Sequence, residues 1–282
     1  MKNRSTKFLF VAAVLGVSFL SIAAFVLFDA FFLEPHWISV SHVSIHNPRL
    51  AAALKGLKIV QISDLHLQGR LGFKEETLIR RVNRLHPDLI FITGDLVEAE
   101  AAAPLVARLF RRLKPRLWSY GVLGNSDKVF LRGGDFSERW KRAGLSLIGG
   151  RSLKMKLGEK PFWLAGIDFP GYGNYDVEAE LDFIFNKIDS SDPVIFLSYS
   201  PDLAPGLAAR GADLILSGDT HGGQVSFPGW SRLFQKLGRS RFIRGLYHLG
   251  KTSLYVNRGI ATKEVPIRFL CPPEITVFTF IN

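Results

Sequence analysis

Two short stretches of the sequence each place a carboxylate and an imidazole two residues apart, directly after an apolar run. The pairs are Asp64 with His66 and Asp219 with His221. In an extended segment, residues two apart point the same way, so an oxygen and a nitrogen could reach one metal ion. A single D-x-H tripeptide is a weak signal, and a polar turn that happens to contain a histidine is the alternative reading.

Further apolar runs also end in groups that could bind a cation. Asp95 follows Gly94, and its two carboxylate oxygens could bridge two ions. Asn125 follows Gly124 and offers a neutral amide oxygen, and Tyr199 follows another run. Glycines beside these residues permit a tight backbone close to a ligand. Because such chemistry recurs at five run ends, a shared metal site is favoured over ordinary turn polarity.

The elements that must position these residues alternate between strands and helices. Short runs rich in β-branched residues precede each polar group, and helical periodicity lies between several of them. This alternation predicts largely parallel, buried strands, with ligands gathered beyond their carboxyl ends. The expected strands are 57–63, 89–93, 119–123, 194–198 and 212–217, and the expected helices cover 78–85, 105–113, 177–188 and 203–209.

Other segments extend the sheets. Residues 37–47 are typical of an extended edge strand. Later runs favour antiparallel pairing, and together the pattern indicates two mixed sheets with helices outside. The runs expected to be antiparallel are 146–150, 152–157, 162–169, 253–257 and 275–281.

The N-terminal stretch 8–28 is uncharged and long enough to cross a hydrocarbon core at about 1.5 Å per residue. A cleaved signal peptide would have a shorter apolar region and a small-residue exit, whereas the exit here, FDAFFLEPHW, is bulky. We therefore expect a membrane anchor over 1–33 and one domain over 34–282. Three basic residues before the run place the N-terminus in the cytoplasm, but the rest of the chain is also basic, so the membrane face of the domain stays open.

The net charge of +11 points to nucleic acid, an anionic lipid surface or a phosphorylated substrate. No nucleic-acid-binding motif is present, and no obligate protein partner is evident. The single cysteine, Cys271, excludes a disulfide within the chain and a cysteine-rich zinc site. Segment 225–251 is basic and aromatic, which indicates either a solvated loop or, as we favour, a lip on an anionic membrane surface. Its basic residues are Arg232, Lys236, Arg239, Arg241, Arg244 and Lys251.

The motifs SDLHL, TGDLV, GNSD and SGDTHGGQ, with the tail YVNRGIATKEVPIRFLCPPEITVFTF, together resemble the calcineurin-like metallophosphoesterases. The similarity covers 32–282 and is greatest to the membrane-anchored bacterial branch, which includes enzymes similar to UDP-2,3-diacylglucosamine pyrophosphatases and general phosphodiesterases. The resemblance implies an α/β fold, a four-layer α/β/β/α sandwich, here with an N-terminal transmembrane or membrane-anchor helix.

The resemblance also implies two metal sites. One would be held by Asp64, His66, Asp95 and His221, and the other by Asp95, Asn125, Tyr199 and Asp219. The second set departs from the family pattern, because Tyr199 and Asp219 stand where the family usually has histidines. Oxygen-rich sites suit Mn²⁺ or Mg²⁺ better than Zn²⁺. We expect two Mn²⁺ ions with the second bound more weakly, and Mg²⁺ or Zn²⁺ as alternatives.

The implied activity is metal-assisted hydrolysis of a phosphorus ester or anhydride. The catalytic motif would comprise Asn125, Ser126 and Asp127, with Ser126 in place of the usual histidine, and Arg258 is a candidate phosphate contact. The expected substrate is amphipathic, and UDP-2,3-diacylglucosamine, cleaved to UMP and an acylated sugar 1-phosphate at the bacterial inner (cytoplasmic) membrane in lipid A synthesis, is the specific hypothesis. The alternatives are a phosphodiesterase for another substrate, and a metal- or lipid-binding scaffold with weakened catalysis.

Overall fold

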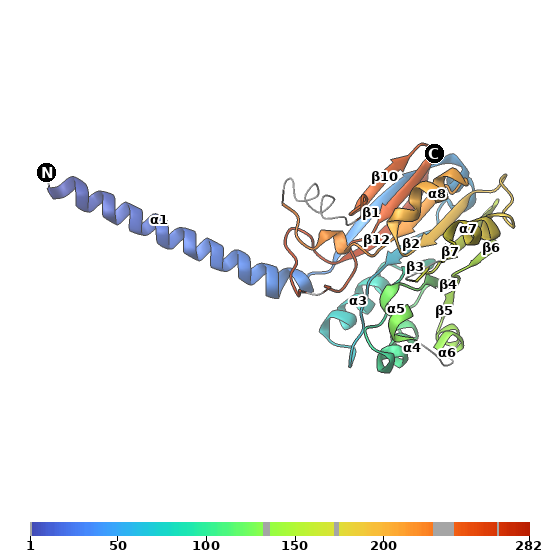
Figure 1. Cartoon of the computed structure of the whole chain (residues 1–282), viewed down its shortest axis with the longest axis horizontal. Helices are drawn as coiled ribbons and strands as arrows, with labels where there is room; N and C mark the ends of the chain where they lie inside the picture. Colours follow the sequence, from blue (N-terminus) through green and yellow to red (C-terminus); the bar gives the residue numbers. More distant parts are fainter. Residues whose placement is uncertain (1, 132–135, 172–174, 228–239, 264) are drawn as a thin grey trace.

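The computed structural model describes residues 2–131, 136–171, 175–227, 240–263 and 265–282. Within them, two six-stranded sheets lie face to face, in the orders β1-β12-β2-β3-β4-β5 and β10-β11-β9-β8-β7-β6 (Figure 1). The first sheet contains β1 (Ser39–His46), β2 (Ile59–Ile62), β3 (Leu89–Thr93), β4 (Trp118–Val122), β5 (Leu145–Leu147) and β12 (Glu274–Ile281). The second contains β6 (Arg151–Lys156), β7 (Pro161–Ile167), β8 (Val194–Ser198), β9 (Leu214–Ser217), β10 (Gly245–Leu249) and β11 (Thr252–Val256).

Helices cover the outer face of each sheet. The four predicted helices are confirmed as α3 (Phe73–Arg84), α4 (Ala103–Phe110), α7 (Val177–Phe185) and α8 (Ala204–Ala209). The structure adds α2 (Pro48–Leu54), α5 (Asn125–Phe130) and α6 (Phe136–Arg142), which are too short to carry a clear periodic signal. Side chains of α3, α4 and α6 pack on the first sheet, and those of α7 and α8 pack on the second.

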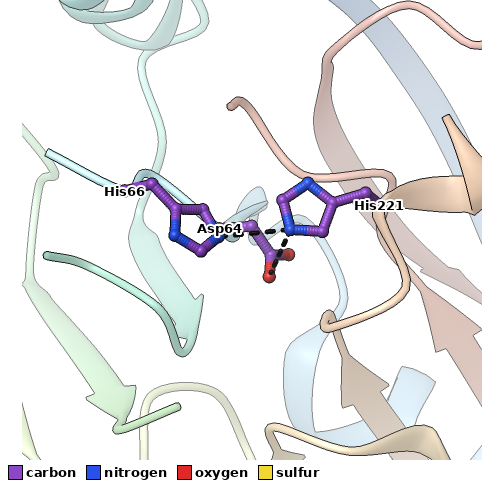
Figure 2. A group of neighbouring side chains, drawn as sticks. All are labelled: Asp64, His66 and His221. Carbon is purple, nitrogen blue, oxygen red and sulfur yellow. Dashed lines mark hydrogen bonds and ion pairs between the residues drawn. The ribbon is translucent and has the colours of Figure 1, made fainter. Parts of the chain in front are cut away.

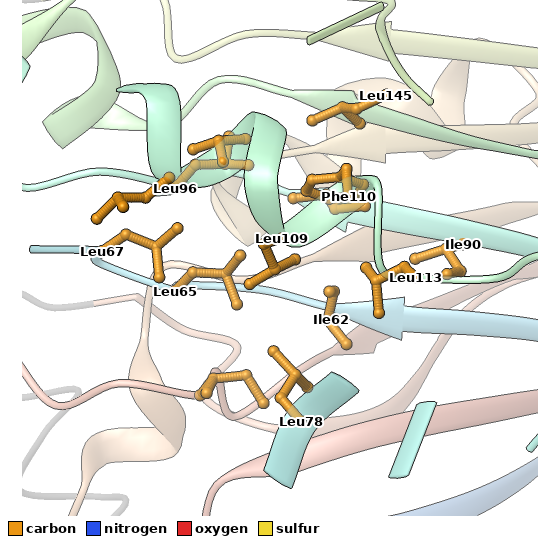
Figure 3. Close-up of a cluster of buried hydrophobic side chains, with 14 of the residues drawn as sticks. Ile62, Leu65, Leu67, Leu78, Ile90, Leu96, Leu109, Phe110, Leu113 and Leu145 are labelled. Atoms are coloured by element: carbon orange, nitrogen blue, oxygen red, sulfur yellow. The ribbon is translucent and has the colours of Figure 1, made fainter. Parts of the chain in front are cut away.

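Alternation along the strands explains why four layers form. In β2, Val60 and Ile62 join the cluster under the helices, whereas Ile59 joins the cluster between the two sheets. Figure 3 shows the helix-side cluster, where Leu78 of α3 and Leu109 of α4 meet strand side chains. Because successive strand residues point to opposite faces, a sheet that is apolar on both faces must be covered on both. The predicted α/β/β/α sandwich is confirmed.

The expected antiparallel direction was wrong for β5, and it is right on only one side of β7 and of β11. Strands β5, β7 and β11 pair in parallel with β4, β8 and β9. The helix α6 lies between β4 and β5, and α7 lies between β7 and β8, which are the long crossovers that parallel neighbours need. The antiparallel prediction is confirmed for β6 against β7, for β11 against β10 and for β12 against β2, although β12 also pairs in parallel with β1.

The parallel strands bring distant loops to one edge of each sheet. Strands β2, β3 and β4 run side by side in one direction, and so do β8 and β9 in the other sheet. Their carboxyl ends therefore meet, and the polar residues that follow them in the sequence are gathered at that edge.

The N-terminal helix α1 (Lys2–Phe28) extends away from the two sheets (Figure 1). It continues through short helical turns, and the run Lys7–His36 spans 30 residues and is apolar enough to cross a membrane. The end of this run is tied to the domain by hydrogen bonds. The amide of Arg268 donates to the carbonyl of Ala30 at 2.9 Å, and the amides of Leu270 and Cys271 donate to the carboxylate of Glu34.

The packing between the sheets generates a stability prediction. Phe91 of β3 is fully buried in the cluster between the sheets. We expect Phe91→Ala to lower the free energy of unfolding by about 3–5 kcal/mol, because the cavity cannot collapse between two sheets. Phe183→Ala, on the exposed side of α7, serves as the matched control and should cost less than about 1 kcal/mol. Chemical denaturation of both variants measures the difference, and equal losses would contradict the assigned layers.

Candidate metal centre

Loops after β2 and β9 bring one carboxylate and two imidazoles together. Ligand atoms of Asp64, His66 and His221 all lie within 4.8 Å of one another, and all three residues are buried. The Nε2 atoms of His66 and His221 are 3.2 Å apart, and Asp64 Oδ1 lies 3.6 Å from His221 Nε2 (Figure 2). The pair Asp64 and His66 therefore faces the same point as His221, 155 residues after His66 in the chain, whereas Asp219 is not part of this cluster.

The backbone geometry behind this cluster differs from the extended geometry that we expected. Strands β2 and β9 end at Ile62 and Ser217, before the polar residues begin. All five acidic and imidazole residues of the strand ends instead adopt positive φ, which is uncommon and unfavourable for residues other than glycine. Their φ angles are 52° at Asp64, 43° at His66, 52° at Asp95, 73° at Asp219 and 50° at His221. Tight left-handed turns, rather than strand alternation, aim these side chains.

Each imidazole is oriented by a partner at its other nitrogen. Nδ1 of His66 is hydrogen-bonded to the carboxylate of Glu98, and Nδ1 of His221 lies 3.1 Å from the carbonyl oxygen of Ala261. Such partners fix the ring and its tautomer, and they leave Nε2 for a ligand. Sequence reasoning missed Glu98, because nothing in the motif TGDLV marks the acid that follows it as a partner of His66.

The electrostatics of the cluster favour a bound cation. Burial, together with the charge of Asp95, raises the pKa of Asp64 to about 7. Burial and the nearby His66 hold the pKa of His221 well below its usual range. The pKa of His66 is raised, since the hydrogen bond to Glu98 and the nearby carboxylates outweigh the effect of burial. Buried acids beside a neutral imidazole fit a divalent ion, which would compensate their charge.

Asp95 joins this cluster to a second group of oxygen atoms. Its Oδ2 lies 3.5 Å from His66 Nε2 and accepts a hydrogen bond of 2.9 Å from the hydroxyl of Tyr199. The same hydroxyl lies 2.8 Å from Oδ1 of Asn125, and Asp219 is a further hydrogen-bond partner. The four residues that the resemblance assigns to a second metal therefore lie together, with Asp95, Asn125 and Asp219 around the hydroxyl of Tyr199.

The phenol of Tyr199 acts here as a hydrogen-bond donor. Burial, with the charges of Asp219 and Asp95, raises its pKa far above the usual range. A protonated phenol is a poor metal ligand, and its proton points to the oxygens that a second ion would need. The donor set around Tyr199 therefore fits a second metal less well than the set around His66 and His221 fits the first.

Asp127 lies beside the centre without facing it. Its carboxylate accepts hydrogen bonds from the amides of Leu96 at 2.8 Å, Val97 at 3.0 Å and Gly124 at 2.9 Å. Burial, with the charge of Asp95, raises its pKa to about 8. These contacts make Asp127 a residue that positions the loops after β3 and β4.

The structure places Ser126 and Arg258 in different settings. The amide of Ser126 donates to Asp95 Oδ1 at 2.9 Å, and its buried hydroxyl has no hydrogen-bond partner among the described residues. The guanidinium of Arg258 binds the carboxylate of Glu274 at 3.2 Å and also reaches serine hydroxyls of β1. Arg258 is therefore engaged at the edge of the first sheet rather than with the histidine cluster.

Two glycines leave room for the carboxylates. A Cβ atom at Gly218 would lie 1.9 Å from Ser63 Oγ and 2.7 Å from Asp64 Oδ2. A Cβ atom at Gly124 would lie 2.1 Å from Asp95 Oδ1. Contacts this short are impossible, so these positions need glycine for close approach rather than for backbone freedom.

Two basic residues that sequence reasoning missed lie near the centre. Lys263 lines a cavity of ≈ 240 Å³ together with Gln68 and Glu98, and its charge acts on His221. Arg268 is fully buried, and its guanidinium donates to backbone carbonyls that include that of Ala261, the partner of His221. Both residues lie in the tail motif, where no spacing rule distinguishes them from solvated cations.

The profile of the calcineurin-like phosphoesterase family matches residues 57–223, which contain every residue of the histidine cluster. The chain belongs to this family. Family members bind divalent metals and hydrolyse phosphoesters, so the chain is a metal-dependent phosphoester hydrolase by descent. The fold and the donor set agree with that assignment, although no comparison identifies the ion.

Relatives of the chain are similar over most of its length. The uncharacterized metallophosphoesterase YkuE of Bacillus subtilis is 32% identical, over 88% of this chain and 87% of the relative. A transmembrane protein with metallophosphoesterase domain from Danio rerio is 32% identical, but only 56% of that protein is covered. The UDP-2,3-diacylglucosamine pyrophosphatase LpxG of Chlamydia trachomatis is 29% identical, over 86% of this chain and 89% of the relative. A solved structure, TT1561 of Thermus thermophilus, aligns with a TM-score of 0.47 at 15% identity, covering 72% of this chain and 90% of that one.

The glycine contact at the centre can be tested by substitution. Because a methyl group at Gly218 must displace both Ser63 Oγ and the carboxylate of Asp64, we expect Gly218→Ala to weaken Mn²⁺ binding about tenfold or more. Gly206→Ala is the matched control, since its nearest neighbour would be 3.7 Å away in helix α8. Isothermal titration calorimetry measures both affinities. An unchanged affinity in Gly218→Ala would show that Asp64 is not a ligand.

Proposed function

We propose that Asp64, His66 and His221, with Asp95, hold a divalent cation, and that Mn²⁺ is the ion bound. The observation that carries this proposal is the pair of facing Nε2 atoms, 3.2 Å apart, with each Nδ1 already hydrogen-bonded. The carboxylates of Asp64 and Asp95 suit Mn²⁺ or Mg²⁺, whereas the two imidazoles suit Zn²⁺, so Zn²⁺ and Mg²⁺ are the alternatives in the test.

The site supports hydrolysis of a phosphodiester or phosphoanhydride. A bound divalent ion would polarise the phosphoryl group and favour attack by water. Ser126 supports this role, because its unpaired buried hydroxyl could donate a hydrogen bond to a phosphoryl oxygen.

Lys263 takes over the phosphate-binding role that the sequence suggested for Arg258, because the guanidinium of Arg258 is bound to Glu274. Asn125 contributes its amide next to Asp95, and Asp127 keeps both loops in place.

We further propose that the two metal sites are unequal. A second ion, held by Asp95, Asn125, Tyr199 and Asp219, would have to displace the proton that Tyr199 directs at those oxygens. Burial opposes loss of that proton, so the second ion binds more weakly than the first. The unequal sites favour an enzyme with one firm metal over a scaffold that has lost both.

The substrate proposal rests on the anchor and on one relative. We propose that residues 1–33 anchor the chain in a bacterial inner membrane and that 34–282 form the catalytic domain, which acts on an amphipathic phosphate compound. The relative LpxG, a UDP-2,3-diacylglucosamine pyrophosphatase, supports a lipid-linked substrate, with UMP and an acylated sugar 1-phosphate as products. Residues 228–239 of the lip expected over 225–251 lie outside the described residues, and in the rest of it Arg241, Arg244 and Lys251 are exposed.

Removal of a proposed ligand should abolish turnover. We expect Asp64→Ala to reduce Mn²⁺-dependent hydrolysis of bis(p-nitrophenyl) phosphate by about a hundredfold or more, because the ion loses a ligand that no neighbour replaces. Glu159→Ala, an exposed acid at a distant turn, is the control and should retain the full rate. The measurement is the initial rate of hydrolysis by the full-length protein in detergent. Equal rates for wild type and Asp64→Ala would contradict the proposal that this site is catalytic.

The proposed inequality of the two sites can be tested at Tyr199. Replacing the phenol by an imidazole removes the competing proton and supplies a nitrogen ligand. We therefore expect wild type to retain one Mn²⁺ per chain, whereas Tyr199→His binds a second ion and gains affinity for Zn²⁺. Elemental analysis after gel filtration gives the stoichiometry, and Tyr199→Phe separates loss of the hydroxyl from gain of the ligand. A wild type with two equally tight ions would contradict the unequal sites.

A further inference from the structure

Large apolar side chains are exposed around the end of the N-terminal helical run. They come from three separate segments and are between 37% and 72% exposed. We call this set the collar, and it consists of Phe31, Phe32 and Trp37 beside the helix, Phe73 at the start of α3, and Val265 and Leu270 in the tail loop. Exposed apolar groups of this size gathered in one region usually mark an interaction surface.

Contacts between the three segments show that the collar is one region. Glu34 accepts hydrogen bonds from the amides of Leu270 and Cys271, which fixes the tail loop against the end of the helical run. The charge of Lys74 at the start of α3 acts on His36, so α3 begins beside the same point. In Figure 1, the tail loop and the start of α3 lie on the side of the domain from which α1 leaves.

The collar is continuous with a helix that is itself suited to lipid. The side chains of the apolar window in the run Lys7–His36 are not buried against the domain, and Phe31 and Phe32 of the collar lie in the last turns of that run. Aromatic residues such as Phe31 and Trp37 are typical of the boundary between acyl chains and head groups. Lys74 and Lys263 place positive charge near this rim, as expected for a surface that meets anionic head groups.

The collar also borders a cavity beside the metal centre. Val265 belongs to the collar and lines the cavity that contains Glu98 and Lys263. Glu98 in turn is hydrogen-bonded to His66 of the metal centre. A surface resting on the collar would therefore lie next to the cavity whose wall includes Glu98, the partner of His66.

We infer that the collar is seated in the surface of a lipid bilayer, so that the cavity beside the metal centre opens at the level of the head groups. This inference rests on the membrane anchor of the proposed function and adds the surface by which the domain itself contacts lipid. It identifies the substrate class as phosphates whose apolar part stays in the bilayer while the phosphate enters the cavity.

Depth-dependent quenching in the full-length protein tests the inference. Single cysteines at Phe73→Cys and Leu270→Cys are labelled with a fluorescent thiol reagent and reconstituted in phosphatidylcholine–phosphatidylglycerol vesicles that contain nitroxide lipid. We expect fluorescence to fall at least about twofold, since an interfacial surface lies about 5–10 Å into the head-group boundary. Phe183→Cys, a similarly exposed phenylalanine position on α7, should be unaffected. The native Cys271 is buried, and unsubstituted protein gives the background.

A label at a fourth position distinguishes failure of the collar inference from failure of the membrane-anchor proposal. A label at Leu20→Cys, within α1, reports insertion of the anchor. If that label is quenched while Phe73→Cys and Leu270→Cys behave like Phe183→Cys, the anchor stands and the collar inference is wrong. If the Leu20→Cys label is not quenched, both fail. If the collar labels are shielded from water but not quenched by nitroxide lipid, a second copy or another protein covers the collar, and the inference is also overturned. Hydrolysis of a soluble diester is measured separately and does not decide among these outcomes.

Discussion

The close approach of two imidazole nitrogens is the interaction on which the rest of this structure depends. His66 and His221 follow strands of different sheets, yet their Nε2 atoms lie 3.2 Å apart at a buried point beside Asp64. Two such nitrogens are compatible at this distance only if they share a proton or a cation. The left-handed turns, the glycines without room for a methyl group and the partners at each Nδ1 all serve to keep this geometry.

The neighbourhood of Asp95 is the basis of the proposal that this chain binds one ion more firmly than a second. Its carboxylate lies between the histidine cluster and the hydroxyl of Tyr199. A histidine in place of Tyr199 would offer a lone pair where the phenol offers a proton. This one substitution would therefore turn an unfavourable contact with a cation into a favourable one. Asp219 adds negative charge at the same place, which favours oxygen-preferring ions. If the proposed sites are correct, selectivity would arise from the donor set around Asp95 and not from the fold.

The sequence predicted the elements and their polar ends better than it predicted their pairing. Runs such as 57–63 and 89–93 carry enough apolar residues to identify buried strands, and parallel packing requires their ends to meet. The parallel pairing of β5 with β4, of β7 with β8 and of β11 with β9 depends on crossovers and partners far away in the chain, which a local pattern does not contain. The hydrogen-bond partners of the polar side chains could not be predicted from the sequence either. Nothing in the spacing shows that Arg258 binds Glu274 or that Glu98 binds His66.

The carboxylate of Glu34 has a consequence for where the chain can be cut. It lies in the last turns of the N-terminal helical run, but both its oxygens are occupied by backbone amides of Leu270 and Cys271. Cys271 packs in turn against the carbonyls of His221 and Gly222. Shortening the chain past Glu34 for crystallisation would leave two amides without acceptors, next to the segment that carries His221. A fragment made for solubility should therefore begin ahead of Ala30. Such a fragment would still contain the exposed side chains of Phe31 and Phe32, which would lower its solubility.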